Sequence, residues 1–252
     1  EIIDAAGLRE TAPNMPLAKG TPFARGHTRH VPAGRRLVIP GDNPANAMAS
    51  AAGFVATAAD TARFFGQLAA GAKQSVISVA SRREMTRRHW RVNQSAELHY
   101  GLGLAIGATE GFEWFGHGGG FQGYLSRTAV LTDSEIAISV LSNSIDGAAP
   151  YWLDGCLHIL RAFRTRGAPE RRLSDWRGRW WTIWNAIDLV PVGKHVMVGN
   201  PHMVDRRRAA RPRPPRRPPP RAAREEAPRT ARPRDRVRGP PGGTAPPPGW
   251  SA

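Results

Sequence analysis

The sequence has little cysteine, little lysine and no long apolar run. The single cysteine, Cys156, excludes an internal disulfide and offers no cysteine-based metal cluster. No stretch approaches the length that a helix needs to span a bilayer. Three of the 36 basic residues are lysines and the rest are arginines, which is typical of a GC-rich gene. A chain of 252 residues holds one large domain or two small ones.

Positive charge is concentrated at the C-terminal end. Residues 206–252 contain 14 Arg against three acidic residues and supply +11 of the formal net charge of +16. They contain no Leu, Ile, Phe or Met, so they cannot bury enough apolar surface to offset chain entropy, and we expect a disordered tail. Three interpretations are open: a basic arm, a solvated low-complexity extension, or a reading-frame error. The composition, mostly Ala, Arg, Pro and Gly, favours the frame error.

Short helices and loops are expected in the first part of the chain. Residues 17–49 contain several closely spaced prolines and are expected to form loops. Thr57 is typical of a helix N-cap, with Asp60 at the third helical position, and this helix is predicted to end at Gly71. A second, strongly basic helix is expected over 77–89.

An antiparallel sheet is predicted in the middle of the chain. One strand is expected over 100–106, and strands over 125–131 and 135–141 are joined in a hairpin pattern. A helix over 149–163 follows, and its predicted apolar face consists of Trp152, Cys156, Ile159, Leu160 and Phe163. Because helices and strands occur in separate runs, the predicted fold class is α+β, an antiparallel sheet flanked by helices.

A tryptophan cluster marks the next segment, with members Trp176, Trp180, Trp181 and Trp184. Such a cluster suits a ligand platform or a core, and a core is the commoner use. Apolar stretches follow at 187–192 and 196–198. We therefore divide the chain into 1–167, an incomplete β-rich domain that starts in 168–205, and the tail 206–252.

The most informative stretch is Gly116-His117-Gly118-Gly119-Gly120-Phe121-Gln122-Gly123-Tyr124. Glycine inside a strand indicates that a ligand or another chain approaches the backbone closely. Taken alone, His117 is better explained as a core or turn histidine, but within this glycine run it indicates a groove. By contrast, His27 and His30 have no acidic or cysteine partner nearby, so we read them as loop histidines rather than metal ligands.

Three segments occur in the order of three motifs of one family. Residues 51–60 are similar to an Ala-Gly-Gly-Leu-x-Ser-Thr-Ala-x-Asp helix start, and residues 100–103 to a Tyr-Gly-Leu-Gly strand. Residues 116–124 resemble a third motif with His-x-Gly in place of Lys-Thr-Gly. Over roughly 1–205 the chain thus resembles the bacterial β-lactamase-related serine hydrolases, which include class C β-lactamases, penicillin-binding DD-peptidases and related esterases. The resemblance implies that 1–167 is the C-terminal part of their catalytic domain.

The resemblance also implies a chemistry, acyl transfer through a serine of a Ser-x-x-Lys motif. The substrate would be an ester, an amide, a β-lactam or a D-amino-acid peptide, and no cofactor or metal is implied. The N–H of Gly120 would be one of two oxyanion donors. His117 would take the place of the motif's cation and orient the substrate or a tyrosine. The acyl chain would lie against Gly118, Gly119 and Tyr124.

The motifs that carry the nucleophile and its base are missing. Neither Ser-x-x-Lys nor Tyr-x-Asn occurs anywhere in the 252 residues. Both belong to the N-terminal half of the family's domain, so we expect an inactive fragment of a serine hydrolase whose parent acts on a small molecule or peptide. The alternative is a non-catalytic binding protein whose basic tail contacts nucleic acid or another anionic surface. Nothing within 1–205 forms the basic and aromatic surface that nucleic acid requires, so the hydrolase fragment is preferred.

Overall fold

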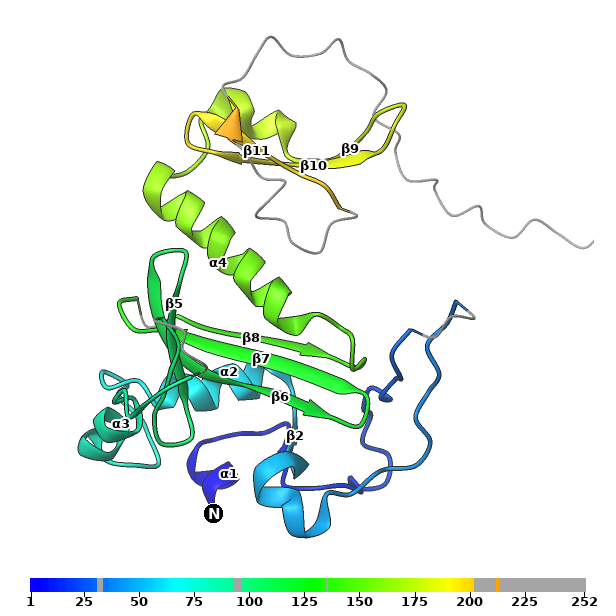
Figure 1. Cartoon of the computed structure of the whole chain (residues 1–252), viewed down its shortest axis with the longest axis vertical. Coiled ribbons are helices and arrows are strands. Elements are labelled where there is room, and N and C mark those ends of the chain that lie inside the picture. The colour runs from blue at the N-terminus through cyan, green and yellow to red at the C-terminus, as the bar shows by residue number, and fades with distance from the viewer. Residues whose placement is uncertain (31–33, 93–96, 135, 202–211, 214–252) are drawn as a thin grey trace, which may run out of the picture. The chain divides into compact units, whose positions relative to one another are not determined.

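The computed structural model describes residues 1–30, 34–92, 97–134, 136–201 and 212–213 (Figure 1). The N-terminal segment contains the short helix α1 (Ile2–Ala5) and a two-stranded sheet of β1 (Thr11–Ala12) and β2 (Val55–Ala56). The loop predicted over 17–49 ends in a 3₁₀ turn, η1 (Asn46–Met48), which leads into a π-helical turn, η2 (Ala49–Gly53).

Helix α2 (Ala58–Gln67) begins where the sequence predicts. The N–H of Asp60 donates to Thr57 Oγ1 at 3.2 Å, which is the expected N-cap bond. The Asp60 side chain is 2% exposed, and its carboxylate accepts hydrogen bonds from the N–H of Glu10 (2.7 Å), from Thr11 Oγ1 (3.0 Å) and from Arg63 (2.9 Å). This buried carboxylate therefore ties the start of α2 to the β1 segment.

The predicted end of α2 at Gly71 is wrong by a few residues. The helix stops at Gln67 because the next residues turn more tightly. The Arg82 guanidinium donates hydrogen bonds to the carbonyl groups of Ala69 (2.6 Å) and Ala72 (3.0 Å) in this turn. Arg82 belongs to α3 (Val79–Met85), which lies inside the basic helix predicted over 77–89. One buried arginine thus joins the two helices.

Six antiparallel strands form the main sheet in the order β3-β4-β5-β6-β7-β8. Their bounds are β3 (Trp90–Arg91), β4 (His99–Tyr100), β5 (Ala105–Thr109), β6 (Phe112–Phe121), β7 (Tyr124–Leu131) and β8 (Ala137–Ser142). The hairpin predicted between β7 and β8 is confirmed. The single strand predicted over 100–106 is wrong: Gly103 has a φ of +75° and the N–H of Gly101 bonds the Leu104 carbonyl, so a tight turn separates β4 from β5.

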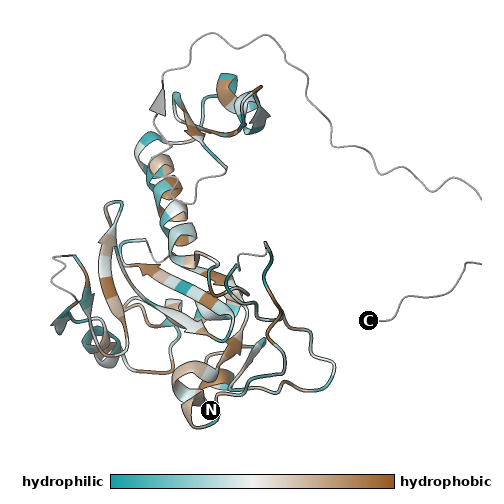
Figure 2. Cartoon of the chain, turned by 45° about the vertical axis from the view of Figure 1, so that its right-hand side comes forward, coloured by the Kyte–Doolittle hydropathy of each residue, from teal (hydrophilic) through white to brown (hydrophobic). Residues whose placement is uncertain are grey.

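Helices cover both faces of this sheet (Figure 1). Helix α4 (Ala149–Arg166) packs on one face, where the core residues are Ala105, Phe112, Trp114, Ala129, Leu131, Leu153 and Leu157. Helix α2 packs on the other face, where the core residues are Leu68, Ala69, Leu104, Ile106, Phe115 and Val130. Apolar residues recur along the strands between these helices (Figure 2). The α+β fold class is confirmed.

The predicted apolar face of α4 is wrong for three of its five residues, while Leu160 packs against the core as predicted. Its buried residues are Ala149, Leu153, Leu157 and Ala162, whereas Trp152, Cys156 and Phe163 are exposed. The helix carries apolar side chains on two neighbouring faces. The sheet is covered by the aliphatic face, from which Leu153 and Leu157 enter the core.

A second, four-stranded antiparallel sheet follows η3 (Arg171–Trp176), in the order β12-β11-β10-β9. Its strands are β9 (Gly178–Trp181), β10 (Ala186–Val192), β11 (His195–Gly199) and β12 (Pro212–Arg213). Trp176 and Trp180 pack against a core of Leu173, Leu189 and Val196, whereas Trp181 and Trp184 are exposed. The prediction for 206–252 lies outside the described residues, except for the two residues of β12. Within the described ranges, no helix is long and apolar enough to cross a membrane.

Candidate functional site

Strand β6 carries the glycine run and has one open edge. It pairs with β7 from Trp114 to Phe121, but with β5 only as far as the Ala105–Gly116 pair. Beyond Gly116, none of the strands in the described part of the chain borders β6 on the β5 side. Half of this strand therefore has backbone groups without a strand partner, where an extended ligand can bind.

The hairpin turn determines which backbone groups face the open edge. The turn residues Gln122 and Gly123 have φ of +37° and +92°, so the flanking pair Phe121–Tyr124 is the hydrogen-bonded pair that closes the hairpin. Hydrogen-bonded and non-bonded pairs alternate along an antiparallel ladder. The N–H and C=O groups of Gly118 and Gly120 consequently point away from β7, toward the open edge.

His117 lies beside this edge and contacts Tyr100 of β4. The Tyr100 hydroxyl is 2.8 Å from His117 Nε2, and the rings meet edge to face with centroids 5.8 Å apart. His117 Nδ1 contacts the Gly118 carbonyl oxygen. Since a carbonyl oxygen only accepts, Nδ1 carries the proton, and in the neutral ring Nε2 accepts from the Tyr100 hydroxyl. The two side chains thus form a hydrogen-bonded pair at the surface of the sheet.

The glycines of the run differ in whether the surrounding sheet leaves room for a side chain. A Cβ on Gly116 would lie 2.0 Å from the Thr128 carbonyl oxygen, so the sheet itself requires glycine there. On Gly118 and Gly120 the nearest atoms would be 3.4 and 3.6 Å away, which are contacts that a side chain tolerates. On Gly119 the nearest atom would be the Ser126 hydroxyl, at 2.7 Å. The sheet thus does not explain glycine at positions 118 and 120.

Sequence reasoning missed three residues of this site. Tyr100 was recognised as part of a strand motif but not as the partner of His117. Ser126 and Arg127 are the register partners of Gly119 and Gly118 on β7. The Arg127 guanidinium stacks over Trp114 at 4.6 Å, and burial lowers its pKa while the Asp154 charge opposes that change. The turn at Gln122-Gly123 sets the β7 register and was the available signal for Ser126 and Arg127.

Tyr124 lies at the end of the site nearest the β6–β7 turn, and its side chain is hydrogen-bonded to a loop. Its hydroxyl donates to the Ala24 carbonyl at 2.8 Å, and the N–H of His27 donates to the Gly123 carbonyl at 3.2 Å. Its predicted role against the acyl chain stays a prediction. The five residues predicted for the site all lie on β6 or at the start of β7.

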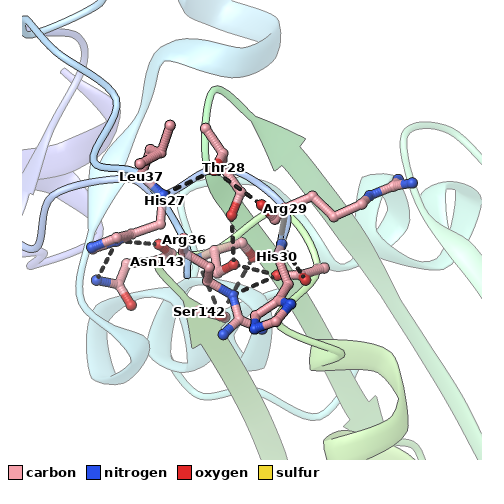
Figure 3. Close-up of polar contacts among 10 residues, drawn as sticks. His27, Thr28, Arg29, His30, Arg36, Leu37, Ser142 and Asn143 are labelled. Atoms are coloured by element: carbon pink, nitrogen blue, oxygen red, sulfur yellow. Dashed lines mark hydrogen bonds and ion pairs between the residues drawn. The ribbon is translucent and has the colours of Figure 1, made fainter. Parts of the chain in front are cut away.

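The same loop forms a polar cluster with the segment after β8 (Figure 3). His27 Nδ1 lies 3.0 Å from the Asn143 carbonyl oxygen, and Arg36 Nε donates to Asp146 at 2.8 Å. Arg36, the N–H of His30 and the Ser144 hydroxyl together hold the pKa of Asp146 well below its ordinary value. An open depression of about 370 Å³ is lined by His27, Arg36, Asn143 and Ser144. Among the described residues, no group of three His, Cys, Asp or Glu side chains could hold a metal ion.

The open glycine edge and the sheet between two helical layers define a class, the β-lactamase and penicillin-binding-protein fold. The structure of the octameric penicillin-binding protein homologue from Pyrococcus abyssi is similar, with a TM-score of 0.53 and 19% identity over 79% of this chain and 46% of that one. A D-stereospecific amidohydrolase from Streptomyces sp. matches with a TM-score of 0.47 and 24% identity over 56% of this chain and 41% of that one. A β-lactamase/D-alanine carboxypeptidase from Pseudomonas syringae matches with a TM-score of 0.47 and 17% identity over 64% and 51%.

The beta-lactamase family model matches residues 1–151. The chain belongs to this family, the β-lactamase-related serine hydrolases, as the three sequence motifs predict. It spans about half the length of the solved structures that it resembles. No curated protein sequence matches it.

Proposed function

We propose that the open edge of β6 is the acyl-binding side of a serine hydrolase site whose nucleophile this polypeptide does not carry. The observation that supports this is the outward direction of the Gly118 and Gly120 backbone groups beside His117. An outward backbone N–H can donate a hydrogen bond to a carbonyl oxygen that becomes negatively charged. The substrate would be an ester, amide, β-lactam or D-amino-acid peptide.

In this proposal Gly120 supplies an oxyanion donor, and Gly118 pairs with the backbone of the substrate. An oxyanion donor contributes about 3–4 kcal/mol in the transition state when it is well placed. His117 Nε2 accepts a hydrogen bond from the Tyr100 hydroxyl, so together they would supply one transferable proton near the carbonyl. Gly119 and Ser126 would line the same face.

The chain itself is proposed to be inactive. It has no Ser-x-x-Lys and no Tyr-x-Asn, and removing the nucleophile costs about as much rate as removing the whole catalytic group. Purified chain should hydrolyse nitrocefin, p-nitrophenyl acetate and D-alanine amide no faster than buffer. A rate well above buffer that falls on Ser126→Ala would contradict the proposal.

The parent activity is tested at the level of DNA. Sequencing the genomic DNA upstream of the Glu1 codon should show an in-frame Ser-x-x-Lys followed by Tyr-x-Asn. Sequencing through the codons for 206–252 tests the frame error in the same experiment, because a one-base correction should replace the Arg-Pro composition by strand-forming residues. Stop codons upstream with no such motifs in frame would rule out the proposed parent.

A further inference from the structure

The hairpin between β9 and β10 carries a cluster of exposed apolar side chains. Trp181, Ile183 and Trp184 are 71%, 90% and 86% exposed, within four consecutive residues. The same sheet already has a core, to which Trp176 and Trp180 belong. Trp181 and Trp184 are therefore not needed to fill that core, and contiguous exposed apolar residues of this size mark an interaction surface.

The loop that presents this cluster pairs several of its own polar groups. The Thr182 hydroxyl accepts from the N–H of Trp184 (3.1 Å) and of Asn185 (3.0 Å) and donates to the Asn185 carbonyl (2.9 Å). The N–H of Thr182 donates to the same carbonyl. Burying an unpaired N–H or C=O away from water is costly. Because these groups are paired internally, the tip can enter an apolar medium at a lower cost, and the same bonds hold its shape.

Two arginines lie in the hairpin near the tip, and Asp175 and Asp188 flank it. Residues 176–187 contain Arg177 and Arg179, both exposed, and no acidic residue. Asp188 pairs with Arg179 through two hydrogen bonds, while Arg177 has no ion-pair partner in the described part of the chain. Tryptophan prefers the boundary between headgroups and acyl chains, and arginine binds anionic headgroups.

We propose that the β9–β10 hairpin tip inserts Trp181, Ile183 and Trp184 into the surface of an anionic lipid bilayer. Insertion would add an apolar contribution to the electrostatic attraction of the arginines, including those of 206–252. This binding is separate from the hydrolase site and does not depend on it.

The test is binding of the full chain to vesicles. Vesicles of phosphatidylcholine with one third phosphatidylglycerol are compared with phosphatidylcholine alone, in 0.1 M and 1 M NaCl, by co-sedimentation. The double variant Ile183→Ser/Trp184→Ser should lower the partition coefficient at least tenfold at both salt concentrations. The matched control, Trp90→Ser, removes a tryptophan that is 57% exposed on the main sheet and should stay within twofold of the parent. Brominated lipid should quench part of the tryptophan fluorescence of the parent chain. The quenched fraction should be smaller in the double variant.

Three results would overturn the proposal. Vesicle binding that the double variant retains, and that 1 M NaCl abolishes for both proteins, would assign the binding to the tail's charge alone. Concentration-dependent dimerisation that the double variant loses, without vesicle binding, would make the tip a contact between copies of the chain. Binding to duplex DNA in place of vesicles would assign the basic residues to nucleic acid. Far-UV circular dichroism checks that the variants fold, which is expected because the substituted side chains are exposed.

Discussion

Replacing Gly116 and Gly120 by alanine, one at a time, separates the glycine that the sheet needs from the glycine that the site needs. The Cβ of Gly116→Ala would lie 2.0 Å from the Thr128 carbonyl oxygen and 3.0 Å from the Ala129 Cα. Non-bonded heavy atoms prefer about 3.5–4.0 Å, so β6 and β7 would have to move apart by more than about 1 Å. Ala129 is fully buried, so the core cannot yield without losing contacts.

The magnitude follows from the bonds at that point. Moving the strands apart weakens the ladder bonds next to Gly116, at about 1 kcal/mol each, and overpacking adds about 1–3 kcal/mol. We expect Gly116→Ala to lower the free energy of unfolding by about 3–5 kcal/mol. In Gly120→Ala the new Cβ has its nearest neighbour at 3.6 Å, so the variant should gain about 0.5 kcal/mol, because alanine restricts the unfolded chain.

Urea unfolding at 25 °C, followed by far-UV circular dichroism, measures both changes, and an unchanged m-value shows that the states compared are the same. The two variants should move the midpoint in opposite directions. A loss below about 1 kcal/mol in Gly116→Ala, or an equal loss in both variants, would refute the assignment of Gly116 to the sheet and of Gly120 to the site.

Three further predictions concern polar groups. Asp60→Ala should lower the free energy of unfolding in urea by about 3 kcal/mol, because it removes a buried carboxylate that accepts three hydrogen bonds. The exposed control Asp42→Ala should change it by no more than about 0.5 kcal/mol, and equal losses in the two variants would contradict this. The pKa of Asp146 is lowered in the fold, so the stabilisation from its bonds to His30 and Arg36 is present above the ordinary carboxyl pKa of about 3.9 and is lost as the pH falls below that value toward the lower pKa of the folded state. The His30 amide resonance should report this loss in acid, and in Asp146→Asn it should take the detached position already at pH 6. Tyr100→Phe removes the donor to His117 Nε2 and should shift the neutral ring away from the Nδ1–H tautomer, which nitrogen-15 spectra of the imidazole detect; identical spectra would exclude the proposed hydrogen bond.

Local signals in the sequence predicted local structure. Thr57 and Asp60 predicted the start of α2, and the β7–β8 hairpin followed from its turn residues. The early end of α2 depends on Arg82, which lies beyond the reach of local patterns because it comes from the next helix. The face of α4 depends on which of two apolar stripes fits the sheet, and only packing decides that.

The site was predicted in part for the same reason. The glycine run and His117 are contiguous, so their pattern was visible in the sequence. The Tyr100–His117 contact requires β4, β5 and β6 to pair in register. The sequence pattern predicts one continuous strand over 100–106, so it misses the turn at Gly101–Leu104 that makes this pairing possible. Long-range register therefore limited the site prediction, whereas residue type did not.

The bare edge of β6 has a stereochemical consequence. A ligand residue that pairs with this edge projects its side chain to one face of the sheet if it is an L-residue and to the other if it is a D-residue. Gly118 and Gly120 present no side chain on either face, so the edge itself accepts both hands equally. Any preference for one enantiomer must arise from groups above or below the strand. His117 and Ser126 lie on one face and Arg127 on the other, and this asymmetry is the chiral element that the described residues supply.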